Sequence, residues 1–430
     1  MTFRLLIPLC LPFSLLLPSA GLADPLGDLL KSDTFWTEGT GESFMSEHKS
    51  LGFRWTSDDK GSARSTSEEL TVDGKKVGET IVYFEEDKPS RIQISIYNRG
   101  DDGSLGKDEF NAALKSWGGI LSEITGVEMV RRGKDNKSAV KADGVMWAMP
   151  DRAYLLEYSS TGRTNDFQAQ LIRLRVAPIV KKSFMEEQLD EEKVGPVAKA
   201  SLPENVTKDG DDVYIQSVPM VDQGDKGYCA VATAARVFNY YGLQVTMNEL
   251  AQVAGSDPNK GTSSTEMVEE IGRLAGRFKT RVKTHEAMEY DDMEDLTEDY
   301  NKAAKRAGKR GVPDGSGTNK WHNFDMFDPE VLMATRLKSK SGIGKFEREV
   351  QRTIDVGIPL LWTVTVGIFE EPKRISQSRG GHMRLIIGYN AQDREIIFSD
   401  SWGAGHEQKK LGLDEAYCMT KGIYSIQPIK

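Results

Sequence analysis

Cysteine is scarce in this sequence. Three cysteines occur in 430 residues, and Cys10 lies in an apolar N-terminal stretch that is expected to be removed, which leaves Cys229 and Cys418. Two cysteines make at most one bridge, so a scaffold held by several disulfides is excluded. In an oxidising compartment Cys229 and Cys418 could pair, and the alternative is that Cys229 is a reactive thiol. No His and Cys cluster has the spacing of a zinc site, so neither a metal nor another cofactor is expected.

Long apolar runs are missing after the first 23 residues. The chain opens with Arg4, an apolar stretch over residues 5–17 and a small-residue end at Gly21-Leu22-Ala23. This pattern predicts a cleaved secretory signal over residues 1–23, with a mature chain that starts at Asp24. No later segment approaches the roughly 20 apolar residues of a membrane helix. We therefore expect a secreted or periplasmic protein with no membrane span.

A basic stretch is missing as well. The net charge is −9 and 28% of the residues are charged, with both signs mixed along the chain. Nucleic-acid binding depends on clustered lysine and arginine, so nucleic acid is excluded as an expected partner.

The length of the chain predicts more than one hydrophobic core, because a single core rarely organises about 400 residues. A strand-rich α+β domain is expected over residues 24–180, a charged linker over 181–212 and a second domain over 213–430. In the first domain a helix is predicted over 107–124, an Asp73-Gly74 turn is predicted to join the first two strands, and the strands are 69–72, 80–84, 91–97, 145–149, 154–158 and 171–176.

In the second domain a helical apolar period precedes a strand period. Thr246 and Glu249 have capping-box spacing, and residues 284–320 look like a charged, surface-exposed insertion. Helices followed by an antiparallel sheet make a segregated α+β fold. The predicted helices are 229–241, a helix starting at 328–330, and 346–356; the predicted strands are 360–366, 383–389, 395–399 and 422–426.

Cys229 stands at the predicted start of a helix, six residues after Gln223. A thiol becomes a strong nucleophile when it ionises, and both a helix N-terminus and a neighbouring imidazolium favour the thiolate. The Gln223 side chain and backbone N–H groups of the Gly-rich segment 224–227 can donate to the oxyanion that forms during acyl transfer. Cys229 and Gln223 are therefore candidate catalytic residues.

His382 and Asp400 lie at the two ends of a predicted hairpin whose turn is residues 390–393. Counting back from this turn places the two residues within about two positions of being cross-strand neighbours. A carboxylate at that distance can orient an imidazole while the other ring nitrogen faces a nucleophile. Each residue alone would be interpreted as structural, and the pairing makes them candidates for base and orienter.

These residues and their order resemble the papain-like cysteine peptidases of clan CA. The segment Ser399-Asp400-Ser401-Trp402-Gly403 is similar to the Asn-Ser-Trp-Gly segment of that family, with Asp in the third role as in the bacterial branch of bacteriocin-processing peptidases. The resemblance covers residues 213–430 and implies a Gln223 oxyanion donor, a Cys229 nucleophile, a His382 base and an Asp400 orienter. It also implies that Trp402 shields the His and Asp pair from water. Tyr228-Cys229-Ala230 departs from the Ser-Cys-Trp pattern of papain.

The sequence thus predicts a secreted bacterial thiol hydrolase that cleaves peptide or isopeptide bonds in a peptide or protein substrate. Two alternatives stay open: an acyl transferase with the same residues, and a non-catalytic peptide-binding module that keeps the fold. For residues 24–180 a protein or a cell-wall component is the candidate partner, and no residue chooses between them.

Overall fold

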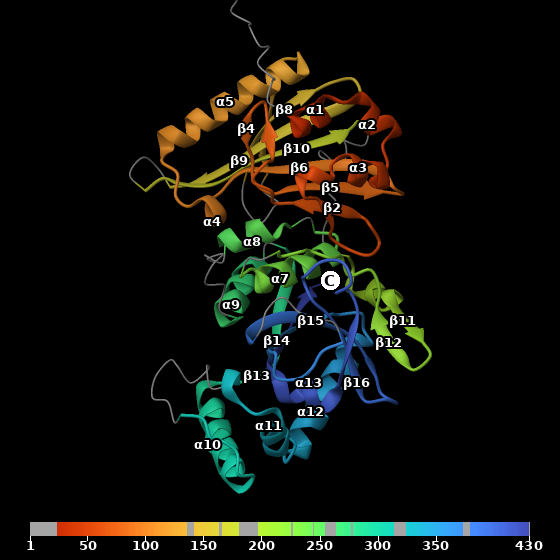
Figure 1. Ribbon diagram of the computed structural model, residues 1–430, viewed down its shortest axis with the longest axis vertical. Coiled ribbons are helices and arrows are strands. Elements are labelled where there is room, and N and C mark those ends of the chain that lie inside the picture. Colours follow the sequence, from red (N-terminus) through yellow and green to blue (C-terminus); the bar gives the residue numbers. More distant parts are fainter. Residues whose placement is uncertain are drawn as a thin grey trace, which may run out of the picture.

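The computed structural model describes residues 24–135, 142–162, 166–179, 197–224, 227–243, 245–253, 264–276, 278–313, 324–372 and 379–429. The predicted signal over residues 1–23 lies outside them. The described residues form two lobes, one above the other in Figure 1, and each lobe has its own sheet and its own hydrophobic core. We refer to the described residues up to 179 as the N-terminal module and to those from 197 on as the C-terminal module.

The N-terminal module is built on an eight-stranded antiparallel sheet in the order β1-β2-β5-β6-β10-β9-β8-β7. Helices cover one face of this sheet, and α5 crosses it on the side away from the C-terminal module (Figure 1). The elements are α1 (Pro25–Lys31), α2 (Asp33–Glu38), α3 (Gly41–Glu47), η1 (Lys49–Leu51), β1 (Arg54–Trp55), β2 (Ser62–Ser65), β3 (Thr71–Val72), β4 (Lys75–Lys76), β5 (Thr80–Glu85), β6 (Lys88–Asn98), α4 (Arg99–Asp102), α5 (Lys107–Thr125), β7 (Val130–Asp135), β8 (Ala142–Ala148), β9 (Arg152–Thr161) and β10 (Gln168–Pro178).

The two faces of this sheet differ in chemistry because side chains alternate along each strand. Ile92 and Ile94 of β6 are fully buried in the core under the helices, together with Trp117 of α5. Arg91 and Gln93 alternate with those isoleucines and therefore lie on the opposite face, toward the C-terminal module. One face of the sheet makes a core and the other is charged.

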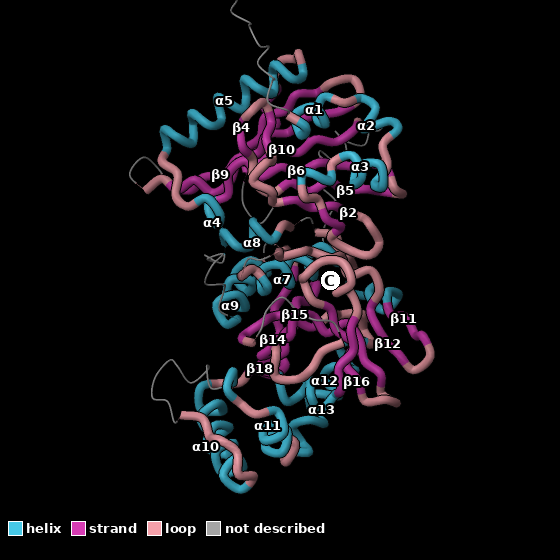
Figure 2. The backbone as a smooth tube through the Cα atoms, in the orientation of Figure 1, coloured by secondary structure: helices cyan, strands magenta, loops and turns pink. Residues whose placement is uncertain are grey.

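The C-terminal module places helices against a second antiparallel sheet, whose order is β11-β12-β15-β14-β18-β13, with β16 pairing β15 and β17 pairing β16. Figure 2 shows α7 and α8 between the strands of the two lobes, and α10 at the far end of the molecule. The elements are η2 (Lys199–Asn205), β11 (Val206–Asp209), β12 (Asp212–Ile215), α7 (Cys229–Tyr240), α8 (Met247–Val253), α9 (Ser264–Ala275), β13 (Thr280–Ala287), α10 (Tyr290–Arg306), α11 (Pro329–Arg336), α12 (Lys340–Ile354), β14 (Leu360–Val366), β15 (Gly380–Asn390), β16 (Glu395–Ser399), β17 (Lys409–Gly412), α13 (Leu413–Met419) and β18 (Thr420–Pro428).

This arrangement confirms the predicted α+β class, and β14 and β16 have the predicted bounds. Thr246 and Glu249 form a capping box, since the Thr246 N–H donates to Glu249 and the Glu249 N–H donates back to the Thr246 hydroxyl. The helical apolar period, the strand period and the capping-box spacing therefore located about half of the elements of the C-terminal module.

One local prediction was wrong, and two others gain detail. The Asp73-Gly74 turn joins β3 to the short β4, whereas β5 pairs with β2 and β6. Residues 284–287 belong to β13, which pairs with β18, and residues 290–306 form α10, so that part of the predicted insertion is regular structure. Residues 199–209, inside the predicted linker, form η2 and β11.

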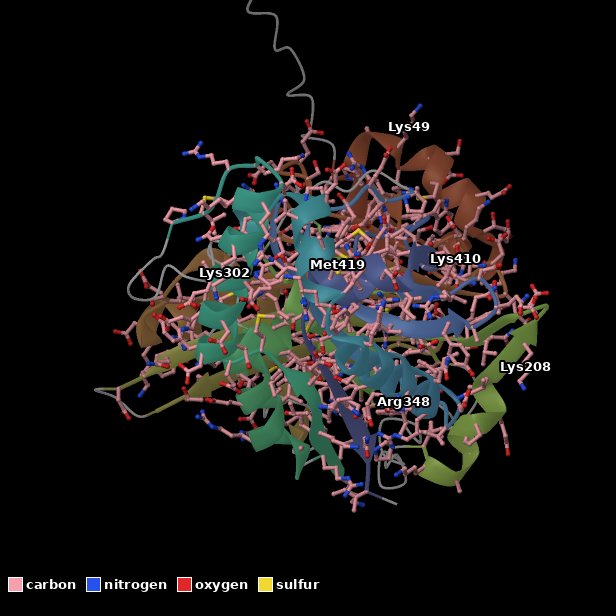
Figure 3. All side chains as sticks on the ribbon, turned by 90° about the horizontal axis from the view of Figure 1, so that it is seen from below. Lys49, Lys208, Lys302, Arg348, Lys410 and Met419 are labelled. Carbon is pink, nitrogen blue, oxygen red and sulfur yellow. The ribbon has the colours of Figure 1, made fainter. Side chains whose placement is uncertain are left out.

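The outer surface of both modules carries the charged side chains. Figure 3 shows Lys49 of the N-terminal module and Lys208 of the C-terminal module projecting from the rim of the molecule. Among the helices that the structure describes, none is both long and apolar enough to cross a bilayer.

Polar contacts join the two modules next to the segments that flank Cys229 and Asp400. These contacts include Arg173 Nη1 to Glu249 Oε1 at 3.0 Å, Gln252 Nε2 to Asn98 Oδ1 at 2.8 Å, Asp58 N to Glu407 Oε1 at 2.6 Å and Tyr228 Oη to Asp101 Oδ1 at 3.5 Å. Because Tyr228 directly precedes Cys229 and Glu407 follows the Asp400 loop, the N-terminal module borders the region that holds the predicted catalytic residues.

Candidate active site

Cys229 is the first residue of α7, a helix that is buried in the core of the C-terminal module. Val231, Ala234 and Phe238 of this helix are fully buried, which fixes α7 against the sheet, whereas Cys229 is partly exposed. Gly224, in the loop that approaches Cys229, has φ +61°, a left-handed conformation that favours glycine. The helix N-terminus, the partial exposure and the glycine loop give the thiol both access to a ligand and a field that favours its ionised form.

His382 reaches the thiol from β15. In the β15–β16 pairing Leu385 lies opposite Ser399, so the next pair along would be Arg384 and Asp400, with His382 two positions further. Side chains two positions apart share a face, and His382 therefore lies diagonally across from Asp400. This is the spacing predicted from the sequence.

The structure brings Cys229, His382 and Asp400 together. His382 Nε2 lies 3.3 Å from Asp400 Oδ1, slightly longer than an optimal hydrogen bond, and both side chains are fully buried. The same imidazole interacts with the Cys229 thiol closely enough to shift the pKa of each group. Since Nε2 faces the carboxylate, Nδ1 is the ring nitrogen left for the sulfur.

The electrostatics of these three groups favour a thiolate beside an imidazolium. Burial raises the pKa of the Cys229 thiol, but the hydrogen bond and charge of His382, with the N–H groups of Met383 and Ala230, bring that pKa below its ordinary value. Burial lowers the pKa of His382, and the contacts with Asp400 and Cys229 overcome this and raise it. A depressed thiol pKa next to a raised imidazole pKa is the condition for an ion pair near neutral pH.

Asp400 is kept ionised by two cations that the sequence analysis did not single out. Arg384 Nε lies 2.9 Å from Asp400 Oδ1, and the Lys409 ammonium contacts the other carboxylate oxygen. Glu371 bridges the same two cations, 3.1 Å from Arg384 and 3.2 Å from Lys409. Burial would raise the pKa of Asp400, but the charge of Arg384 and the contacts with His382 and His406 hold it well below its usual range.

Gln223 lies beside the loop that follows Asp400. Its backbone N–H donates to the carbonyl oxygen of Ser401 at 2.8 Å, and its side chain is 4% exposed. The structure therefore fixes the Gln223 segment to the Asp400 segment, at the N-terminal end of α7. The Gln223 amide is thus held by its backbone near the end of α7 at which Cys229 stands.

Arg236 lies on α7 and joins this helix to two other segments of the site. Its guanidinium donates to the carbonyl oxygen of Pro219 at 2.8 Å, to that of Asp400 at 2.7 Å and to the Ser399 hydroxyl at 2.6 Å. Burial lowers the pKa of Arg236 to about 10. The sequence could have indicated this role, because Arg236 stands within the apolar run 230–238. A buried charge is costly there unless it is paired or hydrogen-bonded.

Trp402 covers the imidazole. Its indole stacks on the His382 ring with 4.2 Å between centroids and 7° between planes, and it meets His406 edge to face. This agrees with the shielding that the resemblance implied. His406 was not expected at the site, yet its Nδ1 lies 4.0 Å from Asp400 and its carbonyl oxygen accepts from the Asp400 N–H at 3.0 Å.

Cys418 does not pair with Cys229, and both thiols are free. Cys418 is fully buried in the core, and burial raises the pKa of its thiol to about 12. Within the ranges that the structure describes, no group of three or more His, Cys, Asp or Glu side chains has a geometry suited to a metal ion.

A Ser, His and Glu arrangement also occurs away from Cys229. His285 Nδ1 lies 2.7 Å from Glu349 and Nε2 lies 2.8 Å from the Ser425 hydroxyl. Ser425 is 0% exposed, so its oxygen cannot meet a substrate carbonyl. This group joins β13 to α12 and β18 as a structural contact.

Comparison with known proteins finds a family that is similar to the C-terminal half of the chain. Residues 215–422 match the Peptidase_C39 like family. The C-terminal half of the chain is papain-like. Among solved structures, the crystal structure of xylellain, a cysteine protease from Xylella fastidiosa, is similar to 55% of this chain and 91% of that chain, at 14% identity and a TM-score of 0.26. No curated protein matches the chain.

The papain-like assignment rests on the family match, which covers the C-terminal half of the chain alone. The same half contains Gln223, Cys229, His382 and Asp400, and His382 interacts with both the Cys229 thiol and the Asp400 carboxylate. The cations around Asp400 went unnoticed in the sequence, although Arg384 stands in a strand that is otherwise apolar from Met383 to Ile387. A charge in such a strand indicates a buried partner.

Proposed function

We propose that the chain is an exported thiol hydrolase that cleaves peptide or isopeptide bonds through an acyl-enzyme on Cys229. The contact of one imidazole with both a thiol and a buried carboxylate is the observation that carries this proposal. The match to a peptidase family supports the choice of an amide bond as the target.

In the proposed mechanism the Cys229 thiolate attacks the substrate carbonyl carbon, and the carbonyl oxygen becomes an oxyanion. The Gln223 side chain and the Cys229 N–H donate to that oxyanion. The His382 imidazolium gives its proton to the departing amine as the carbon–nitrogen bond breaks, and the neutral imidazole then takes a proton from the water that hydrolyses the thioester. Asp400 orients the imidazole and stabilises its charge in both steps.

The ion pair can be tested by the pH dependence of Cys229 alkylation with iodoacetamide. We expect a reactive thiolate whose apparent pKa lies below about 7 in the wild type, and a reaction in His382→Ala that requires pH above about 8.5, the value of an ordinary thiol. Cys418→Ala is the matched control, because Cys418 is buried and its substitution should leave the profile unchanged. An identical profile in wild type and His382→Ala would contradict the ion pair.

Turnover tests the nucleophile and separates the alternatives. Cys229→Ala should lose hydrolysis of a peptide substrate by a factor of about a thousand or more, with an unchanged circular dichroism spectrum. Mass spectrometry of the product in the presence of a free amine distinguishes a transferase, which adds the amine, from a hydrolase, which adds water. A fold-preserving binding module would show neither product.

Export is a separate part of the proposal. It rests on the apolar stretch over residues 5–17 and the small-residue end at Ala23. Expression in a bacterium with an intact secretion system should yield a chain that starts at Asp24, which N-terminal sequencing of the periplasmic or culture-medium fraction would reveal. A cytosolic product that retains Met1 would contradict it.

A further inference from the structure

A cavity of about 400 Å³ lies between the two modules, and Cys229 is not among the residues that line it. Its lining comes from β2, β5, β6 and β10 on one side and from the segments 219–222 and 239–248 on the other. Figure 1 shows these strands directly above α7 and α8. Its volume falls within the range of about 300–1,000 Å³ that is common for small-molecule sites.

The N-terminal wall of the cavity is cationic. Arg64, Arg91, Arg173 and Arg175 line it, with the carboxylates of Glu79 and Asp222. Glu157 and Glu249 pair with Arg173 and Arg175, and Arg132 also contacts Glu157, so five arginines face four carboxylates and one positive charge is in excess. The arginines share one sheet face: Arg91 stands beside Gln93 on β6, and Gln93 lies opposite Arg175 of β10. Strand alternation and register therefore place the arginine side chains together on one face of the sheet.

These arginines are rigidly held. Arg173 and Arg175 both contact Glu157, at 2.6 Å and 2.5 Å, and Arg91 lies over the Tyr83 ring at 4.0 Å from its centroid. Burial lowers the pKa of Arg175, opposed by Glu157, and the like charges of Arg173 and Arg91 lower it further. A guanidinium whose charge is repelled by its neighbours gains from an added anion.

The C-terminal wall is mainly apolar. Val221, Leu243, Val245 and Met247 line it opposite the arginines, and its polar residues are Asp222, Asn239, Thr246 and Asn248. A fully solvated, doubly charged ion such as phosphate would have to lose water against this wall without compensation. A carboxylate with an aliphatic body satisfies both walls, with its charge on the arginines and its body on the apolar residues.

We propose that this cavity is a binding site for a small aliphatic carboxylate, of the size and chemistry of the C-terminal residue of a peptide. The ligand would bridge the two modules, because each supplies one wall. Binding requires neither Cys229 nor His382, so this proposal stands apart from the proposed hydrolysis. The segment 219–222 leads directly into Gln223, which connects the wall of the cavity to the papain-like site.

Isothermal titration calorimetry of the full chain with N-acetyl-L-leucine tests this site. We expect saturable binding of N-acetyl-L-leucine. N-acetyl-L-leucine amide, acetate and inorganic phosphate should each bind at least about tenfold more weakly. The amide lacks the charge, acetate lacks the aliphatic body, and phosphate lacks that body and carries additional charge. No saturable binding, equal affinity for the amide, or tighter binding of phosphate would each overturn the proposal.

Substitutions in the lining locate the binding. Arg91→Gln removes one cation, and Gln93→Glu places a competing carboxylate among the arginines at nearly constant size; each should weaken N-acetyl-L-leucine binding by about tenfold. Arg131→Gln is the matched control, because Arg131 is exposed on β7 at the other edge of the same sheet, and it should bind like the wild type. Unchanged affinity in both Arg91→Gln and Gln93→Glu would overturn the assignment to this cavity.

Discussion

At the scale of the residue, Asp400 stands out because it belongs to a buried network of two carboxylates and two cations. Arg384 and Lys409 each contact both Asp400 and Glu371, and all four side chains are at most 4% exposed. Water is excluded from this group, so each charge depends on the others for compensation. The orientation of His382 is thus determined by a network and not by the carboxylate alone.

Removing one member of the network should be costly. We expect Lys409→Met to lower the free energy of unfolding by about 3 kcal/mol, because two buried carboxylates would then share one cation. The double substitution Lys409→Met with Glu371→Gln should recover part of the loss, since it removes one charge of each sign. Urea denaturation monitored by circular dichroism measures both.

Lys410→Met is the matched control for that experiment. Lys410 is next in the sequence and pairs with Asp212 and Glu395, but its side chain is 37% exposed. Exposed pairs contribute less than about 1 kcal/mol. A loss in Lys409→Met no larger than in Lys410→Met would mean that the network does not support Asp400.

The sequence predicted the residues that surround the sulfur and missed those that surround the carboxylate, for a physical reason. Cys229 and Gln223 are close in the chain, and His382 and Asp400 are related by one hairpin, so local rules place them. Lys409 reaches Asp400 from β17, and Glu371 reaches Lys409 from the segment after β14; only the folded sheet brings these together.

At the scale of the element, β15 is the strand on which the site depends, since it pairs with β14, β16 and β12. The register shifts between Ile386 and Gly388 in its pairing with β16. The sequence predicted this hairpin from its alternating pattern and its turn. The sequence did not predict that β12 pairs with β15, because local periodicity does not show which strands from distant parts of the chain become neighbours in a sheet.

Gly388 is required where β12 meets β15. A methyl group there would lie 2.5 Å from the Val213 carbonyl oxygen, which a strand pair cannot accommodate without moving. We expect Gly388→Ala to cost about 2 kcal/mol and to speed hydrogen exchange in β11 and β12. Gly381→Ala, in the same strand with no atom within 4 Å of the added methyl, is the control. Equal exchange in the two variants would contradict this role.

At the scale of the whole molecule, the polar face of the N-terminal sheet lies against the C-terminal module. Glu157 is central to that face, where it contacts Arg132, Arg173 and Arg175, and Arg173 also reaches Glu249 of the other module. The sequence predicted two modules from length and composition, but it could not predict their contact, since the arginines come from β7 and β10, which are not neighbours in the sheet.

The Glu157 cluster should make the stability sensitive to acid. Burial raises the pKa of Glu157, but the arginines lower it from 4.5 to about 2. A carboxyl group with a depressed folded-state pKa stabilises the protein above its unfolded pKa, and that stabilisation, about 3 kcal/mol here, disappears as the pH falls from 4.5 toward 2. The unfolding free energy of wild type minus that of Glu157→Gln should therefore shrink between pH 6 and pH 3. A constant difference would contradict the prediction.

The stacking of Trp402 on His382 gives the site an optical reporter. A protonated imidazole in van der Waals contact with an indole quenches its emission, whereas the neutral ring does so weakly. Trp402 is one of seven tryptophans, so the spectrum of a Trp402→Phe variant must be subtracted from that of the wild type. The difference emission should be weak while His382 is charged, and it should increase as the pH rises through the raised pKa of His382. The fluorescence of Trp402 therefore reports the protonation state of the imidazole.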